Sequence, residues 1–280
     1  MTMIRTIPFF EKFRSDKFVY KMQPVKKTNR HNLDQMPGDC DVTQQSVCSF
    51  LSREELQLFD ERKSCLFFKK GQHIFNEGSY PLGIYCIDTG KVKLEHQGEE
   101  GKMQIVRLAK AGDIIGYRAL LCNEKYNASA VALEDVQACF IPKDAFLKVL
   151  ESNNRLSLFF VGLLAADLRR AEETLTELAQ KPVRERMAKA LLSLLDTYGA
   201  EADGKTINIT LSREELADIV GTATETTIRL LSEFRNEGLI ELVGKRIRII
   251  NYSRLVDTAH GYAPTPRLQP WQTYSGTRSA

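Results

Sequence analysis

Glu225 and Arg229 stand four residues apart at the start of a predicted helix, so their side chains share one helical face. A glutamate carboxylate can accept a hydrogen bond from cytosine N4, and an arginine can donate to guanine O6 and N7 or to a phosphate. On an ordinary helix surface the same spacing forms only a salt bridge. Here the pair opens the second of two short helices, and we therefore interpret it as a base-reading pair for double-stranded DNA.

The two helices are predicted from a cap, a break and the spacing of apolar residues. Ser212 and Glu215 form the capping-box pattern that begins a helix, and Gly221 supplies the break after it. The second helix is predicted over 224–237 and places apolar residues on the face opposite Glu225. Two short helices joined by a glycine-containing turn are typical of a helix-turn-helix.

The segments around these helices complete a winged helix-turn-helix domain. An amphipathic helix and a short strand are predicted before them, and Gly244-Lys245 marks the turn of a hairpin after them. These elements are expected at 183–198, 207–211, 240–243 and 246–250. Neighbouring side chains fit further contacts to DNA, most of them to phosphates, which set register without specifying sequence. They are Thr222, Thr224, Thr226, Arg213, Lys245 and Arg246.

Upstream, the chain changes to short β-type runs separated by glycine-containing turns. Eight strands are predicted, at 65–68, 73–75, 83–87, 91–96, 104–108, 113–115, 128–133 and 136–141. Strands at this regular spacing favour an antiparallel barrel or jelly roll. Jelly-roll barrels of this size commonly hold one small ligand.

A single long helix is predicted over 144–179, between the barrel and the winged helix, and Pro182 ends it. Its apolar residues follow one another in steps of three and four, which is the a/d seam of a coiled coil. The seam residues are Val161, Leu164, Leu168, Ala171, Leu175 and Leu178. The helix could instead pack only on its own barrel, but an unbroken seam favours a partner helix, and we predict a parallel homodimer.

The composition sets limits on the class of protein. The chain has 280 residues and a net charge of +3, so any nucleic-acid binding must be local. Its longest apolar run, 156–166, is too short to span a membrane. Six dispersed cysteines without a signal peptide indicate a reducing cytoplasm. The sequence contains no zinc spacing, phosphate-binding loop or nucleophile motif, so we predict neither an enzyme nor a bound cofactor.

Two stretches of the chain resemble the CRP/FNR family of bacterial transcription regulators, and the resemblance spans about residues 40–255. One is similar to the family's DNA-binding signature and reads SREELADIVGTATETTIRLLSEFRNEGLIELVGKRIRIIN. The other is similar to its cyclic-nucleotide-type jelly roll and reads KKGQHIFNEGSYPLGIYCIDTGKVKLEHQGEEGKMQIVRLAKAGDIIG. The resemblance implies a homodimer on a two-fold symmetric operator, with a barrel effector that reorients the recognition helices through the long helix.

The resemblance also implies where an effector would bind. Family members that bind cyclic AMP carry Gly-Glu-Leu and, further along, Arg-Ser or Arg-Thr, which hold the ribose and the cyclic phosphate. The corresponding residues here are Gly116, Tyr117 and Arg118, then Asn127 and Ala128. A buried phosphate would lack its usual cation, so we predict an effector other than cyclic AMP, unless Arg118 supplies the charge from another direction.

An iron–sulfur or thiol redox sensor of the same fold is an alternative. Oxygen-sensing members hold a 4Fe–4S cluster on three N-terminal cysteines and one in the last barrel strand. Cys40, Cys48 and Cys139 resemble three of these ligands, whereas the remaining position is Thr43. Three thiolates leave one iron without its usual ligand, so we predict no metal site. The other cysteines are expected to be small buried hydrophobes, an interpretation that stays open for Cys139. They are Cys65, Cys86 and Cys122.

We therefore expect an α+β protein with an N-terminal antiparallel β jelly-roll barrel, a long dimerisation helix and a C-terminal winged helix-turn-helix. The parts are predicted as a disordered basic extension at 1–38, the sensor barrel at 39–143, the dimerisation helix at 144–181, the DNA-binding domain at 182–260 and a disordered tail at 261–280. We predict a cytoplasmic, sequence-specific transcription regulator whose partners are double-stranded DNA, a second copy and RNA polymerase, and not a membrane. A ligand-sensing module for a partner protein, without DNA binding, is the alternative from another functional class.

Overall fold

The computed structural model describes residues 46–98 and 101–260, all within one unit of the chain, Pro37–Ala280. The predictions for 1–38, Cys40 and 261–280 lie outside the described residues. The first elements are η2 Ser46–Phe50, α1 Arg53–Arg62, β1 Ser64–Phe68, β2 His73–Phe75, β3 Gly83–Thr89, β4 Lys91–Gln97, β5 Met103–Lys110, β6 Ile114–Ile115, α2 Tyr117–Cys122, β7 Ser129–Ala132 and β8 Val136–Pro142. Those that follow are α3 Lys143–Ser152, α4 Asn154–Gln180, α5 Val183–Tyr198, α6 Arg213–Val220, α7 Thr224–Asn236, β9 Ile240–Val243, β10 Arg246–Ile249 and α8 Tyr252–Thr258.

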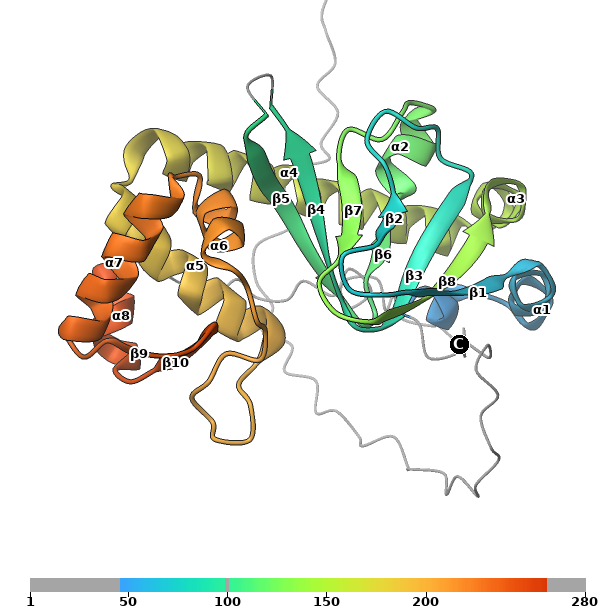
Figure 1. Ribbon diagram of the computed structural model, residues 1–280. Coiled ribbons are helices and arrows are strands. Elements are labelled where there is room, and N and C mark those ends of the chain that lie inside the picture. The colour runs from blue at the N-terminus through green and yellow to red at the C-terminus, as the bar shows by residue number, and fades with distance from the viewer. Residues whose placement is uncertain (1–45, 99–100, 261–280) are drawn as a thin grey trace, which may run out of the picture. The chain divides into compact units, whose positions relative to one another are not determined.

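Strands β1 to β8 form two facing antiparallel sheets (Figure 1). In the described part of the chain each sheet has four strands, in the orders β1-β8-β3-β6 and β2-β7-β4-β5. All eight predicted strands are present, with ends that shift by two residues at most. The predicted α+β fold class is confirmed, with an N-terminal β domain, a long helix and a C-terminal helix-turn-helix with a hairpin wing. Helix α2 was not predicted, because its six residues are too few to show a helical period.

A glycine turn joins the two sheets where β3 passes into β4. Gly90 has a φ of +90°, a conformation that a residue with a Cβ atom rarely adopts. A Cβ atom at this position would lie 2.5 Å from the carbonyl oxygen of Asp135. The turn therefore needs glycine both for its backbone conformation and for its packing.

The helix predicted over 144–179 is broken at Asn153 into α3 and α4, so this prediction was wrong on that point. Asn153 has an extended backbone, and its side-chain oxygen accepts a hydrogen bond from the Leu156 N–H at 3.0 Å. Its amide nitrogen donates to the Phe50 carbonyl and to the Glu55 carboxylate, each at 2.9 Å. Asn153 thus caps α4 and fastens it to η2 and α1.

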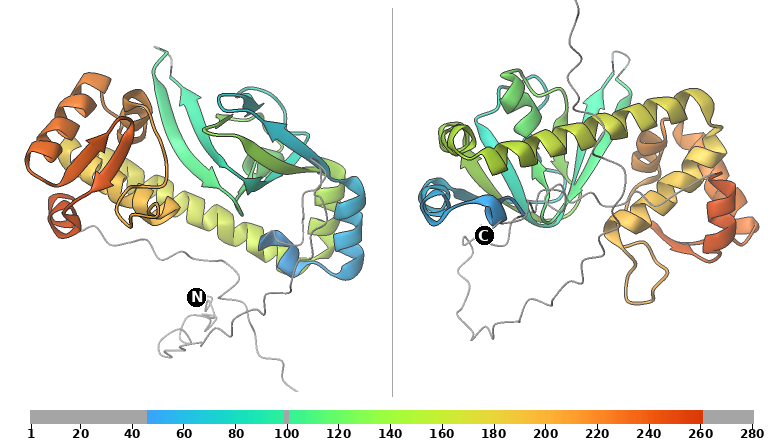
Figure 2. Two further views of the ribbon diagram at one scale, coloured as in Figure 1. Left: turned by 60° about the horizontal axis from the view of Figure 1, so that its bottom comes forward. Right: turned by 180° about the vertical axis from the view of Figure 1, so that it is seen from behind.

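Helix α4 buries one apolar face against the barrel. Leu156, Phe159 and Phe160 lie in the same core as the barrel residues Ile84 and Ile141. Figure 2 shows α4 running beside the strands and on toward α5. Although α4 is 27 residues long, no helix within the described ranges combines the length and apolarity needed to cross a bilayer.

Helices α5 to α8 and the hairpin β9–β10 surround a second apolar core. Helices α5, α6 and α7 and the hairpin agree with the predicted elements, whereas α8 was not predicted. The strand predicted over 207–211 was wrong, because Ile207 and Thr206 take part in isolated bridges instead. The barrel residue Leu133 belongs to this second core, so the two domains share an apolar contact.

Candidate DNA-binding site

Helix α6 begins at a complete capping box, as predicted. The Glu215 N–H donates to Ser212 Oγ at 3.0 Å, and the Ser212 N–H donates to Glu215 Oε2 at 2.8 Å. Gly221 ends the helix with a φ of +70°, and a Cβ atom there would lie 2.9 Å from Leu178 Cδ2. The turn between α6 and α7 therefore favours glycine because of its left-handed backbone conformation, whereas the Leu178 side chain could move to make room for a Cβ atom.

Helix α7 presents two contrasting faces. Its buried face consists of Thr227, Leu230, Leu231 and Phe234. Glu225, Ile228 and Arg229 are exposed on the other side. The buried face anchors the helix in the domain core, so these three exposed side chains, the reading face of α7, are held by a rigid element.

Arg229 forms its ion pair with Glu233, at 2.9 Å, one turn further along α7. Arg229 therefore pairs with Glu233 and not with Glu225, the partner considered in the sequence analysis. An exposed pair at this spacing contributes about 0.3–0.5 kcal/mol, so a base or a phosphate can replace Glu233 as the partner of Arg229 at small cost.

Ile228 belongs to the reading face but was not predicted as a contact. An apolar residue in a helical pattern usually indicates the buried face. The exposure of Ile228 could therefore be inferred from the sequence only through its angular position on the helix relative to Leu230 and Leu231. The structure leaves Ile228 49% exposed, between Glu225 and Arg229 in sequence. Apolar side chains on a helix that enters the major groove can contact the methyl group of thymine.

The other predicted DNA contacts lie on α6, the wing and the start of α7. Arg213 donates to the Gly244 carbonyl at 3.1 Å, which ties α6 to the wing turn, and burial lowers the pKa of its guanidinium. Lys245 is exposed at the wing turn, and Arg246 pairs with Glu201 at 3.0 Å. The predicted threonines are partly exposed, and they are Thr222, Thr224 and Thr226.

Helix α6 also contacts the barrel. Lys93 Nζ on β4 lies 3.3 Å from a carboxylate oxygen of Glu215, and the Gln104 amide on β5 donates to the Asp218 carbonyl. The Asp218 carboxyl group is partly buried at this contact. Burial raises its pKa to about 6, and the negative charge of Glu214 acts in the same direction.

The structure distributes the expected effector residues between the interior and the surface. Gly116 caps α2 with a φ of +88°, and Tyr117 and Ala128 are buried. Arg118 and Asn127 are exposed. The Arg118 side chain lies at the surface, and its role as the cation for a bound effector stays a prediction.

A partly buried cation does occur at Arg107 on β5, which the sequence pattern did not single out. Its Nη1 donates to the Tyr117 hydroxyl at 3.2 Å and lies 3.6 Å from a carboxylate oxygen of Asp167 on α4. The Tyr117 hydroxyl donates to Asp167 Oδ2 at 2.5 Å. Burial raises the pKa of Tyr117 to about 12, so this hydroxyl keeps its proton at neutral pH.

Cys48 and Cys139 are buried in one apolar core, and Cys139 is flanked in the strand register by Cys65 on β1 and Cys86 on β3. Burial raises the pKa of Cys139 to about 11, so it is a protonated and weakly reactive thiol. Within residues 46–98 and 101–260, no group of three or more His, Cys, Asp or Glu side chains could hold a metal ion. Cys122 is exposed, and Cys65 is half-buried and disulfide-bonded, so the expectation of small buried hydrophobes was wrong for both.

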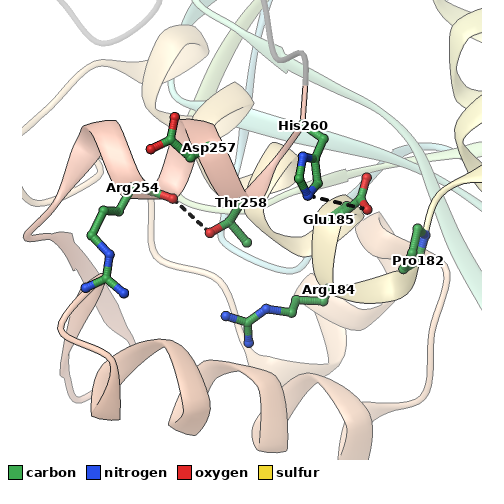
Figure 3. A pocket seen from close by; sticks show the side chains of 7 residues that line it. All are labelled: Pro182, Arg184, Glu185, Arg254, Asp257, Thr258 and His260. Carbon is green, nitrogen blue, oxygen red and sulfur yellow. Dashed lines mark hydrogen bonds and ion pairs between the residues drawn. The ribbon is translucent and has the colours of Figure 1, made fainter.

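A pocket of about 490 Å³ opens between α5 and α8 (Figure 3). Figure 3 shows the Glu185 and His260 side chains facing each other. The distance between His260 Nε2 and Glu185 Oε1 is 4.0 Å. The lining residues are Pro182, Arg184, Glu185, Arg254, Asp257, Thr258 and His260. None of the residues predicted for DNA or effector binding is among them, so the pocket is separate from the reading face of α7.

Two protein-family models match the chain. Residues 65–153 match the cyclic nucleotide-binding domain, and residues 185–258 match the Crp-like helix-turn-helix domain. The chain belongs to the CRP/FNR family of transcription regulators. The family predicted from the two stretches is thus confirmed, together with a non-enzymatic function and DNA binding through the helix-turn-helix domain.

Known proteins are similar to this CRP/FNR regulator over most of its length. The fumarate and nitrate reduction regulatory protein of Vibrio cholerae is 27% identical over 225 residues, 79% of this chain and 89% of the relative. The CRP-like cAMP-activated global transcriptional regulator of Mycobacterium tuberculosis is 29% identical over 194 residues, 69% of this chain and 86% of the relative. The crystal structure of TTHA1359, a CRP/FNR family regulator from Thermus thermophilus, is 27% identical with a TM-score of 0.58, and the match covers 71% of this chain and 100% of that one. Only one of these names states activation by cAMP, so similarity leaves the effector of this regulator undetermined.

Asp218→Asn should stabilise the protein at neutral pH but not at acidic pH. The native pKa of Asp218, about 6, lies above its ordinary value of 3.8, so the native state binds this proton more tightly than the unfolded state does. Protonation of Asp218 stabilises the native state fully at a pH below the ordinary pKa of the group. This stabilisation is lost as the pH rises through the native pKa. We expect the variant to melt at a higher temperature than the wild type at about pH 7.5, and the two melting temperatures to converge at about pH 4.

Thermal unfolding followed by circular dichroism measures this difference, with the exposed Glu225→Gln as a control for loss of one negative charge. A gain in melting temperature that is equal at both pH values would contradict the assignment of the raised pKa to Asp218.

Proposed function

We propose that the protein is a homodimeric, sequence-specific transcription regulator that binds a two-fold symmetric operator through the reading face of α7. The observation that carries the proposal is the composition of that face: a carboxylate, an apolar group and a guanidinium within about one helical turn. Glu225 would accept from cytosine N4, Arg229 would donate to guanine, and Ile228 would contact a thymine methyl group. Together they read neighbouring base pairs.

The side chains around the reading face support phosphate contacts that hold the helix in register. Lys245 and Arg246 belong to the wing turn, and Arg213 is tied to the same turn through Gly244. Wing and recognition helix can therefore contact the DNA as one unit. The threonines at the start of α7 supply hydroxyl donors to the same backbone. They are Thr222, Thr224 and Thr226.

The dimer is supported by a second apolar face of α4. Four members of the predicted seam are 42% to 67% exposed, whereas Leu164 is partly buried against the barrel core. Those four are Val161, Leu168, Leu175 and Leu178, and the remaining members are Leu164 and Ala171. A monomer rarely leaves such a row in water, whereas a second α4 would bury it as a coiled coil. Two-fold pairing of α4 would then present two copies of α7 to a palindromic operator.

We further propose that the regulator responds to something other than cyclic AMP. Arg118 and Asn127, where the phosphate-binding cation was sought, are exposed, and the partly buried Arg107 is paired with Asp167. A cyclic phosphate that paired with Arg107 would have to displace that carboxylate. At a promoter, the regulator would act through RNA polymerase.

Arg229→Ala should weaken operator binding by about 1–3 kcal/mol, since it removes donors to a base or phosphate. Arg235→Ala is the matched control, because Arg235 is an exposed arginine near the end of the same helix. Glu225→Ala should relax discrimination at one base pair more than it lowers total affinity. Fluorescence anisotropy at fixed salt, on an operator selected from random double-stranded DNA, measures these effects. Equal losses for Arg229 and Arg235 would contradict the assignment of the reading face.

Ile228 should make the operator sensitive to a single methyl group. We expect replacement of one thymine by deoxyuridine in each half-site to weaken wild-type binding several-fold, because Ile228 loses an apolar contact. Ile228→Ala should bind the thymine and deoxyuridine operators nearly equally. A scan of deoxyuridine across the half-site identifies the position. If no thymine methyl group affects the wild type more than the variant, Ile228 does not read thymine.

Leu168→Glu combined with Leu175→Glu should convert the dimer to monomers, since the change desolvates like charges across the seam. Thr176→Glu with Gln180→Glu is the control, because it adds the same charge to exposed positions of α4 outside the seam. Sedimentation velocity should show monomers for the seam variant alone, and its operator affinity should fall with dimer content. A seam variant that remains dimeric would place the interface elsewhere.

A further inference from the structure

Arg107, Tyr117 and Asp167 bring three elements together in one polar cluster, which we call the Arg107–Asp167 brace. They come from strand β5, helix α2 and helix α4. The Tyr117 hydroxyl connects the two charged groups by hydrogen bonds of 3.2 Å and 2.5 Å, and the charged groups themselves are 3.6 Å apart. The brace is thus a polar link between the sensor barrel and the helix that carries the seam.

The brace is largely shielded from water. Tyr117 is 1% exposed, and the side chains of Arg107 and Asp167 are 20% and 11% exposed. Arg107 also donates to the Ile114 carbonyl at 3.4 Å, and its guanidinium lies 5.7 Å from the centroid of the Tyr117 ring. Burial opposes the charge on Arg107, but Tyr117, Asp167 and Asp113 together outweigh it and raise the pKa of the guanidinium. Of the two carboxylates, Asp167 is the one within ion-pair distance, so removal of its charge would leave the cation poorly compensated in a poorly hydrated site.

The position of the brace gives it more than a packing role. A planar guanidinium is the group with which proteins commonly hold a carboxylate or a phosphate. Tyr117 stands where the family resemblance places the effector, and Asp167 directly precedes Leu168 of the seam. Asp167 also pairs with Arg170 on its own helix, so its carboxylate is held in place from two sides.

We propose that Asp167 is a built-in anion that takes the place of an effector at Arg107 and couples the barrel to α4 in the ligand-free protein. The protein therefore binds its operator without a small molecule. This inference rests on the proposed DNA-binding function, because the brace acts by holding α4 in the orientation that presents the two copies of α7. A device of this kind changes the operator affinity of the folded dimer and not only its stability.

The test uses the full chain and operator binding without added ligand. The variants are Asp167→Asn, Arg107→Gln, the two combined, and Tyr117→Phe. Glu173→Gln is the matched control, since it removes a carboxylate from an exposed ion pair with Arg169 on the same helix. Affinity is measured at a temperature at which circular dichroism shows each variant folded and sedimentation shows it dimeric.

We expect Asp167→Asn and Arg107→Gln each to weaken operator binding at least about tenfold, and their combination to be no worse than either alone, because one interaction is lost in all three. Tyr117→Phe should lose less, and Glu173→Gln should bind as the wild type does. A lower melting temperature with unchanged operator affinity would show a merely structural role and overturn the inference.

Asp167→Ala tests the anion directly, since it leaves room for a small carboxylate beside Arg107. Formate at about 50 mM should restore part of the operator affinity, whereas chloride at the same ionic strength should not, because the guanidinium fork fits a carboxylate. A folded, dimeric variant that formate does not rescue would overturn the inference. If the wild type selects an operator that Asp167→Asn binds equally well, this inference alone fails, whereas a wild type that selects no operator overturns the DNA-binding proposal as well.

Discussion

Helix α4 has two apolar faces that both have to be buried, and the arrangement of the barrel, the proposed partner subunit and the DNA-binding domain depends on this. Its first turns bury Leu156, Phe159 and Phe160 in the barrel core, which sets the rotation of the helix about its own axis. With that rotation set, Leu168 and Leu175 point away from the barrel and are exposed. The barrel that buries the first face cannot cover the second, so a partner helix is the natural cover, and the proposed two-fold axis follows from the same constraint.

The DNA-binding domain is built so that one helix face stays fixed. The capping box of Ser212 and Glu215 starts α6, Gly221 permits the sharp turn, and the buried face of α7 is locked into the core. Lys93 and Gln104 also connect α6 to the barrel. Any reorientation of the helix-turn-helix relative to its own barrel would have to break these contacts, so the contacts set part of the energy of such a movement.

Charge placement between the barrel and α4 differs from what the family resemblance implies. The resemblance places a phosphate-binding cation at a position that is Asn127 here, and this side chain is exposed. The partly buried cation is Arg107 instead, and Asp167 provides its counter-charge from α4. Burial of two opposite charges is tolerable because each neutralises the other and the Tyr117 hydroxyl satisfies both. The fold thus keeps a charged centre between the barrel and α4.

The sequence by itself determined the local structure, whereas the tertiary structure decided how distant residues meet. The strands, the capping box at Ser212 and the wing hairpin were predictable because each depends on neighbours a few residues away. The break at Asn153 was not, since the contacts that hold its side chain come from Phe50 and Glu55 in a distant segment. Pairing of Arg107 with Asp167 joins groups 60 positions apart in the numbering, and no periodicity encodes it. The exposure of Ile228 was likewise decided by the packing of α7, because an isoleucine in a helical pattern looks like part of the core until its neighbours fill that core.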